Sequence, residues 1–297
     1  MAKSFHYGGQ AVIEGVMIRG KEGIAICVRQ PNGELNILRQ PLAKIYRGRL
    51  RETPLIRGIF VLIETLILGT QALLHSAEVA SESGEEKMPR GILWGTVAVS
   101  VVFGVALFFA VPLFATRYLI DPFIGSALIS NVIEGFIRIG IFVAYLKLIG
   151  LVPDIKRVFA YHGAEHKVVN AYEAGAPLQL DSARRFPTTH ARCGTAFIFI
   201  VLIVAIFIFA ILGRPALWVS VLSRVLLIPV IAIIGYEIVR FTANHSQNRV
   251  VKLLFAPGLL LQAMTTREPD DSQIETAISA LNQVLDIDSN ANLLGKM

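Results

Sequence analysis

The stretch "GILWGTVAVSVVFGVALFFAVPLFAT", residues 91–116, contains no Asp, Glu, Lys, Arg or His. The stretch "CGTAFIFIVLIVAIFIFAILG", residues 193–213, also lacks these side chains. Both are long enough to supply the roughly 20 apolar residues that a helix needs to cross the hydrocarbon core of a bilayer. The whole chain is 54% hydrophobic and 17% charged, whereas soluble domains carry about 25% charged residues. The sequence therefore predicts an integral membrane protein of predominantly α class, with the lipid bilayer as its first partner.

Four transmembrane helices are expected, at about residues 92–115, 131–152, 194–213 and 216–239. The connection 153–192 holds six Lys and Arg residues, and the connection 116–130 holds one. Because cytoplasmic connections are enriched in Lys and Arg, we expect 153–192 and both termini to lie in the cytoplasm. The same asymmetry accounts for the net charge of +6, so no nucleic-acid partner is expected. The first residues show no cleavable signal peptide.

The N-terminal part is expected to be a small accessory element. Residues 1–53 are β-rich and rich in Gly, with a hairpin turn at Pro31-Asn32-Gly33. Residues 54–90 are expected to form an interfacial helix followed by the exposed linker "SESGEEKMPR". A polar stripe along that helix favours the membrane surface over a crossing. It consists of Arg57, Glu64 and Gln71.

The C-terminal part, residues 241–297, is expected to combine an interfacial segment with an amphipathic cytoplasmic helix. Pro257 is expected to break the first segment, and Ser272 with Glu275 to form the capping box of the second. The chain is thus expected to have six parts, with residues 1–53, 54–90, 91–152, 153–192, 193–240 and 241–297. The third and fifth parts hold the transmembrane helices.

The connection 153–192 is expected to be a cytoplasmic loop, and it contains the stretch "YHGAEHK", residues 161–167. In a helix, His162, Glu165 and His166 fall on one face at positions i, i+3 and i+4. The order H-x-x-E-H is the inverted zincin motif, in which two imidazoles bind zinc and the carboxylate acts as a general base. The other interpretation is that these are polar residues at the end of a membrane helix, with Glu165 a solvated charge.

The stretch "HARC" at the far end of the same connection adds His190 and Cys193. Together with His162 and His166, these residues form an N and S ligand set that suits zinc. Four bound ligands would make a closed, structural site, whereas three ligands and a water position would allow catalysis. Cys193 is also typical of a small buried hydrophobic residue. The other cysteine, Cys27, lies far away in the chain, and both are expected to be free thiols or a metal ligand.

Ionisable residues inside the expected spans form a second group. Glu134 and Arg138 lie four residues apart on one helix face and can pair. Arg224 is expected to snorkel outward and Glu237 to lie near the cytoplasmic end. The alternative is that these residues line a path for protons or ions.

Four stretches of the chain form a distinctive combination: "GGQAVIEGVMIRG" (8–20), "YHGAEHKVVNAYE" (161–173), "RCGTAF" (192–197) and "TTREP" (265–269). Together they resemble the YqhQ-like family of bacterial multi-pass membrane proteins. That family has no known function and is described as predicted metal-dependent enzymes. The resemblance implies a bacterial inner-membrane location. It also draws attention to Gln10 and Glu14, for which two interpretations stay open: they line the same cytoplasmic site, or they belong to a structural turn.

The functional expectation is a zinc-dependent hydrolase on the cytoplasmic face, acting on a peptide or lipid-linked group with Glu165 as its base. One alternative is a non-enzymatic membrane scaffold or biogenesis factor with a structural metal site and a membrane-protein partner. Another is a transporter that uses Arg138, Glu134 and Glu237. The sequence does not set the oligomeric state.

Overall fold

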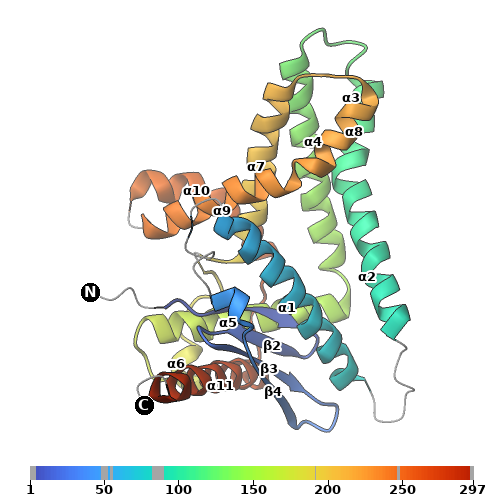
Figure 1. The fold of residues 1–297 in the computed structure, drawn as a ribbon. Coiled ribbons are helices and arrows are strands. Elements are labelled where there is room, and N and C mark those ends of the chain that lie inside the picture. Colours follow the sequence, from blue (N-terminus) through green and yellow to red (C-terminus); the bar gives the residue numbers. More distant parts are fainter. Residues whose placement is uncertain are drawn as a thin grey trace.

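The computed structural model describes residues 5–47, 53, 56–81, 90–190, 192–245 and 248–294. The expected linker "SESGEEKMPR" lies outside these residues, apart from its two ends. The strands, shown in Figure 1, are β1 (Gly8–Val12), β2 (Gly15–Arg19), β3 (Gly23–Arg29) and β4 (Leu35–Pro41), followed by the 3₁₀ turn η1 (Lys44–Arg47). The helices are α1 (Ile56–Ala80), α2 (Arg90–Val105), α3 (Val111–Leu119), α4 (Ala127–Ile149), α5 (Pro153–Glu173), α6 (Leu180–Ala183), α7 (Gly194–Leu212), α8 (Leu217–Leu226), α9 (Ile228–Asn244), α10 (Arg249–Thr265) and α11 (Asp271–Leu294). A π-helical turn, η3 (Ala106–Ala110), joins α2 to α3.

The N-terminal residues form a four-stranded antiparallel sheet in the order β1-β2-β3-β4. The hairpin expected at residues 31–33 is confirmed, because Gly33 has a φ of 87° in the turn between β3 and β4. The stretch "GGQAVIEGVMIRG" forms a second hairpin, with Gly8 paired to Arg19 and Val12 to Gly15. The β-rich expectation for this part of the chain is therefore correct.

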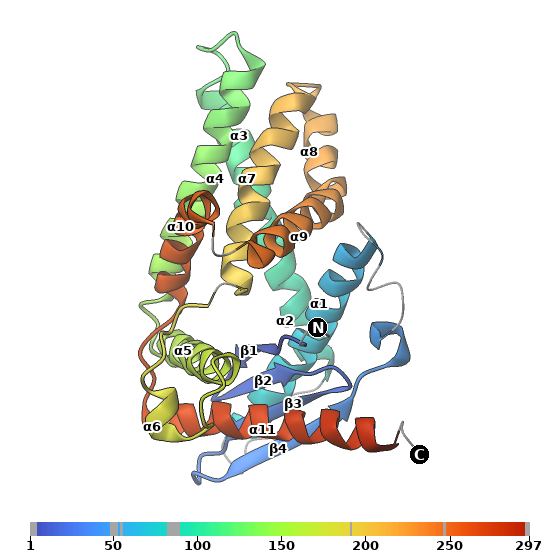
Figure 2. The same ribbon diagram turned by 90° about the vertical axis from the view of Figure 1, so that its left-hand side faces the viewer.

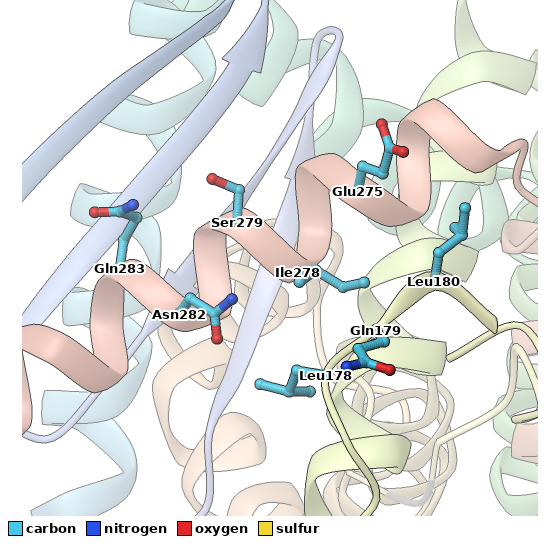
Figure 3. A pocket seen from close by; sticks show the side chains of 8 residues that line it. All are labelled: Leu178, Gln179, Leu180, Glu275, Ile278, Ser279, Asn282 and Gln283. Atoms are coloured by element: carbon cyan, nitrogen blue, oxygen red, sulfur yellow. The ribbon is translucent and has the colours of Figure 1, made fainter. Parts of the chain in front are cut away.

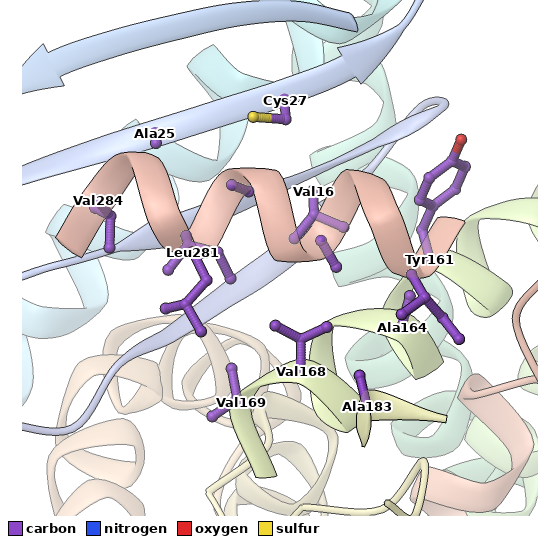
Figure 4. Packing of buried hydrophobic residues seen from close by; sticks show 14 of the residues in the cluster. Val16, Ala25, Cys27, Tyr161, Ala164, Val168, Val169, Ala183, Leu281 and Val284 are labelled. Atoms are coloured by element: carbon purple, nitrogen blue, oxygen red, sulfur yellow. The ribbon is translucent and has the colours of Figure 1, made fainter. Parts of the chain in front are cut away.

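Helices cover both faces of the sheet, as Figure 2 shows. On one face, α5 and α11 pack against side chains of β2 and β3, and Figure 4 shows Val16, Cys27 and Leu281 among the residues of this cluster. On the other face, α1 contributes Leu68 and Ala72. Burial on two sides explains why β2 and β3 read as continuous apolar runs instead of alternating ones.

The remaining helices rise from the sheet layer as an apolar group (Figure 1). Three described helical stretches are long and apolar enough to cross a membrane, namely Arg57–Ala80, Trp94–Leu119 and Gly194–Leu212. Two bent pairs raise this number to five if each pair is one span. The pairs are α4 with α5, bent by 102°, and α8 with α9, bent by 45°. All four expected spans are thus helical, and α1 also qualifies by length and hydropathy.

Three local expectations are corrected by the structure. The connection 153–192 is mostly the helix α5, because Pro153 occupies its first turn, where a proline is tolerated. Pro257 lies inside α10 without ending it, and Gly258 next to it packs beside Ala196 of α7. The capping box of α11 begins two residues earlier than expected. The side chain of Asp270 accepts from the N–H of Gln273, whose own side chain accepts in return from the N–H of Asp270.

The ionisable residues of the apolar helices form a buried cluster. Glu134 accepts hydrogen bonds from Arg138 at 2.8 Å and from Arg224 at 2.8 and 3.0 Å. The expected snorkelling of Arg224 is therefore wrong, because its side chain is only 2% exposed and a buried guanidinium is stable beside a carboxylate. The Phe209 ring lies within cation–π distance of both arginines. Glu237 is not part of this cluster, since it pairs with Arg57 of α1.

Candidate metal centre

The helix α5 presents His162, Glu165 and His166 on one face. The ring centroids of the two histidines are 4.3 Å apart, as expected for residues one turn apart. Gly163 allows the backbone of another segment to lie directly against this turn. A Cβ at residue 163 would be 2.1 Å from the carbonyl oxygen of Arg267. The glycine in the "HGAEH" stretch is therefore required by packing.

Each of the two imidazoles is held by a backbone carbonyl at its Nδ1 atom. The Nδ1 atom of His162 lies 2.9 Å from the carbonyl oxygen of Thr265, and that of His166 lies 2.6 Å from the carbonyl oxygen of Thr188. A carbonyl oxygen only accepts hydrogen bonds, so each Nδ1 carries the proton and donates it. A ring that is protonated at Nδ1 alone presents the lone pair of its Nε2. This is the arrangement by which proteins orient histidine ligands.

Cys193 completes a group of three ligand-type side chains. It is the N-cap of α7, and its sulfur accepts from the N–H of Thr195 at 3.4 Å. The Nε2 atom of His162 lies 3.3 Å from Sγ. One ligand atom from each of His162, His166 and Cys193 lies within 4.8 Å of the others. Zinc bonds of about 2.0–2.3 Å in tetrahedral geometry put ligand atoms roughly 3.5 Å apart, so this donor set fits a zinc ion.

The pKa values of Cys193 and His162 are shifted because the two side chains lie so close together. Burial would raise the pKa of Cys193, but hydrogen bonds from His162 and His166 outweigh it and lower the pKa to about 4. Burial would lower the pKa of His162, but the contact with Cys193 outweighs it and raises the pKa to about 9. Without a metal, the two groups thus favour a thiolate and an imidazolium. A thiolate is the form of cysteine that binds metal.

Glu165 lies beside these ligands, held from another element. Its Oε1 accepts the backbone N–H of Gly9 in β1 at 2.8 Å. Its side chain and the three ligand side chains line one cavity of about 60 Å³, enough for an ion and one or two waters. Glu165 does not belong to the group of close ligand atoms. Glu165 therefore lines the same cavity but lies outside the group of side chains that could hold an ion.

His190 lines the same cavity but its ring nitrogens are engaged elsewhere. Its Nε2 lies 3.3 Å from Oε2 of Glu173, and its Nδ1 accepts from the N–H of Arg192 at 3.4 Å. Its backbone exchanges two hydrogen bonds of 3.0 Å with the buried side chain of Gln262. Burial lowers the pKa of His190. The structure therefore brings together three of the four expected ligands and places the fourth beside them.

Other residues support the site in ways that the sequence only hinted at. The carbonyl of Thr265 belongs to the "TTREP" stretch, whose function had no sequence-based interpretation. Gln10 lines a neighbouring, larger cavity. Glu14 does not reach the site, because it lies in the β1–β2 turn and pairs with Arg157 at 2.5 Å. The sequence carried no signal for Thr188 or Gln262.

A separate groove lies on the opposite side of α5. Figure 3 shows it between α11 and the segment 178–180, with Ile278 and Asn282 among its lining residues. Its volume is about 470 Å³, and it shares no lining residue with the histidine cavity. The groove therefore plays no part in the candidate metal centre.

Comparisons with known proteins identify relatives of the chain. A family model described as "Protein of unknown function (DUF1385)" matches residues 53–287. The "Uncharacterized protein YqhQ" of Bacillus subtilis (strain 168) is 34% identical over 297 residues, which cover 95% of this chain and 93% of the relative. No solved structure matches the chain. The chain therefore belongs to the DUF1385 family of proteins of unknown function, which confirms the YqhQ-like resemblance seen in its motifs.

Proposed function

We propose that this protein is a multi-pass inner-membrane protein with a zinc-dependent hydrolase site on its cytoplasmic face. His162, His166 and Cys193 hold the ion, and Glu165 is the general base. The observation that carries the proposal is the pair of Nδ1 hydrogen bonds to backbone carbonyls, which aim two Nε2 lone pairs at the space beside Sγ. Interfacial polar residues at a helix end have no reason to share that orientation.

The ligand count favours chemistry over a purely structural role. Closed zinc sites use four protein ligands, whereas catalytic ones use three and keep a position open. Here three ligand atoms are grouped, and His190 uses both ring nitrogens in other contacts. A bound zinc supplies Lewis acidity and acidifies water. Glu165 then takes a proton from the attacking water and returns it to the leaving group as the scissile bond breaks.

The location rests on the apolar helices and the distribution of basic residues. Three to five helical stretches can cross a bilayer, and the Lys- and Arg-rich connection that contains α5 belongs to the cytoplasmic side by the positive-inside rule. The 102° bend between α4 and α5 lays the histidine helix across the end of the apolar group. The site thus lies where the sheet layer meets the membrane.

The first test is elemental analysis of the protein purified without chelators. We expect about one zinc per chain in the wild type and less than a tenth of that in the double variant His162→Ala/His166→Ala and in Cys193→Ser. His245→Ala is the matched control, because this exposed histidine contacts only the carbonyl of Phe241 through its ring nitrogen.

Two further variants separate the alternatives. Glu165→Gln should keep the metal, because the carboxylate bonds Gly9 and not the ligand group. His190→Ala should also keep it, whereas loss of metal in His190→Ala would indicate a closed, structural site and favour the scaffold alternative. Absence of metal from a folded wild type would remove the hydrolase proposal.

A further inference from the structure

A second, larger cavity opens directly from the candidate metal centre. It has a volume of about 400 Å³, within the range of about 300–1,000 Å³ for small-molecule sites. We call it the chamber. It shares with the metal cavity the residues Tyr7, Gly8, Gly9, Arg192, Cys193 and Gly194. A molecule in the chamber can therefore reach Sγ of Cys193 and its neighbours with one end.

The two ends of the chamber differ in chemistry. The end next to the metal cavity is polar, with backbone of β1 and the side chain of Arg192. The rest of the lining comes mainly from three helices and is largely apolar, apart from Thr65 and the ion pair of Arg19 with Glu64. Its apolar side chains are Val61, Leu62 and Leu68 of α1, Phe197 of α7 and Val239 of α9. The chamber thus fits a molecule with a polar head and an apolar body.

Only the thickness of α1 separates this apolar wall from the outer surface of the molecule. The outward side of α1 carries large exposed apolar side chains, among them Ile63, Leu66 and Ile67. Exposed apolar surface of this kind is stable against lipid and costly in water. The chamber therefore lies behind a surface that suits contact with lipid.

A peptide substrate fits less well, because two backbone N–H groups at the β1 edge of the sheet already donate hydrogen bonds. Peptides commonly bind a nearby sheet edge by adding a strand. Here β1 is the edge strand, but the N–H of Gly9 donates to Glu165 and the N–H of Ile13, just past the strand, donates to Ser76 of α1. An added strand would have to displace both bonds.

We propose that the substrate of the site is a lipid of the bilayer, whose polar head reacts beside His162 and Cys193 while one apolar chain lies in the chamber between α1, α7 and α9. The inference rests on the proposed hydrolase function and assigns its substrate class. The chain is recognised by burial of methylene groups, each of which strengthens binding about fourfold when it leaves water.

The test uses cobalt-substituted protein and alkyl hydroxamates, which bind an open metal position through their head. Acetohydroxamate has no chain and reports on the metal alone, through the visible spectrum of cobalt. Octanohydroxamate and longer homologues add a chain to the same head. At a fixed detergent concentration, we expect the apparent affinity of the wild type to rise at least about tenfold from acetohydroxamate to octanohydroxamate.

Two variants fill the chamber from two different helices, Val61→Trp of α1 and Val239→Trp of α9. Each variant should keep the spectral change with acetohydroxamate, which would show that the metal centre is intact. Each should lose most of the increase in apparent affinity from acetohydroxamate to octanohydroxamate. Ile63→Trp is the matched control, since Ile63 lies on the same helix, is 45% exposed and does not line the chamber. It should behave like the wild type. Because the detergent concentration is the same for every variant, partitioning of the alkyl chain into the micelle affects all of them equally.

The outcomes separate this inference from the proposed function. If acetohydroxamate changes the spectrum but longer chains bind no better in the wild type than in the filled variants, the lipid inference is overturned and the metal site stands. If acetohydroxamate produces no change in a cobalt-loaded protein, the open metal position is wrong, and both proposals go with it.

Discussion

Gly163 and Arg267 are in backbone contact at the centre of the histidine motif, with room for a hydrogen atom and not for a methyl group. This contact positions the neighbouring Thr265 carbonyl over His162, and so a residue without a side chain controls the orientation of a candidate ligand.

Replacing Gly163 with Ala should therefore weaken metal binding without removing a ligand. The new Cβ would lie 2.1 Å from the Arg267 oxygen, so the 265–267 segment must move and the His162 to Thr265 hydrogen bond is lost. Loss of such a supporting contact typically costs about 10–100-fold in metal affinity. The measurement is the zinc dissociation constant of the variant and of the wild type, determined by competition with a chromophoric chelator. Gly140→Ala is the control, because a Cβ there meets nothing within 4 Å, and equal affinities in the two variants would contradict the argument.

Gln262→Leu should destabilise the protein. The change leaves the N–H and the carbonyl of His190 unpaired in a buried position, and each such group costs about 1–3 kcal/mol. The midpoint of thermal unfolding in detergent should fall clearly below that of the wild type. Gln71→Leu removes the same side chain from an exposed position of α1 and should leave the midpoint almost unchanged.

The two cysteines should differ in reactivity with pH once the metal has been removed. The pKa of Cys193 is about 4, so its thiolate predominates at pH 6 and disappears only as the pH falls through 4. Burial raises the pKa of Cys27 to about 11, so this residue remains a thiol at the same pH. Iodoacetamide at pH 6 should label Cys193 alone, as mapped by peptide mass spectrometry. Zinc should protect it, and equal labelling of both residues would show that the contact with His162 does not form.

Glu134→Gln should be among the most damaging single changes in the apolar helices. It removes the carboxylate that Arg138 and Arg224 share, and removing one member of a buried ion pair costs about 3–5 kcal/mol. The fraction of monodisperse protein and its unfolding temperature should both drop. Glu275→Gln removes an exposed partner 3.9 Å from Arg29, a kind of pair worth about 0–1 kcal/mol. Similar losses in both variants would mean that the cluster is not structurally important.

The sequence predicted the elements whose signals are local. Apolar runs marked the long helices, Asn32-Gly33 marked a hairpin, and the spacing of His162 and His166 placed them on one helix face. The pairing of Glu134 with Arg138 followed from the same helical periodicity. Each of these features depends on residues within a few positions of one another.

The rest depends on contacts between distant segments, which one sequence does not reveal. Arg224 was expected to snorkel because its partner, Glu134, lies 90 positions away. Pro257 was expected to break a helix because proline removes a backbone hydrogen bond locally, whereas α10 continues through it and packs against α7. The grouping of Cys193 with the histidines was a plausible convergence of one connection's two ends, but its supporting carbonyls at Thr188 and Thr265 had no local signal.

The anchoring of His162 by Thr265 also bears on biogenesis. Thr265 follows Cys193 by 72 positions in the chain, so a growing polypeptide exposes all three ligand side chains well before the carbonyl that fixes the first imidazole has been synthesised. Until α10 is in place, His162 is free to rotate and to exchange tautomers. If the site binds a metal ion as proposed, the ion is expected to be acquired late, after α10 has packed against α7, which would guard the unfinished protein against loading with the wrong ion.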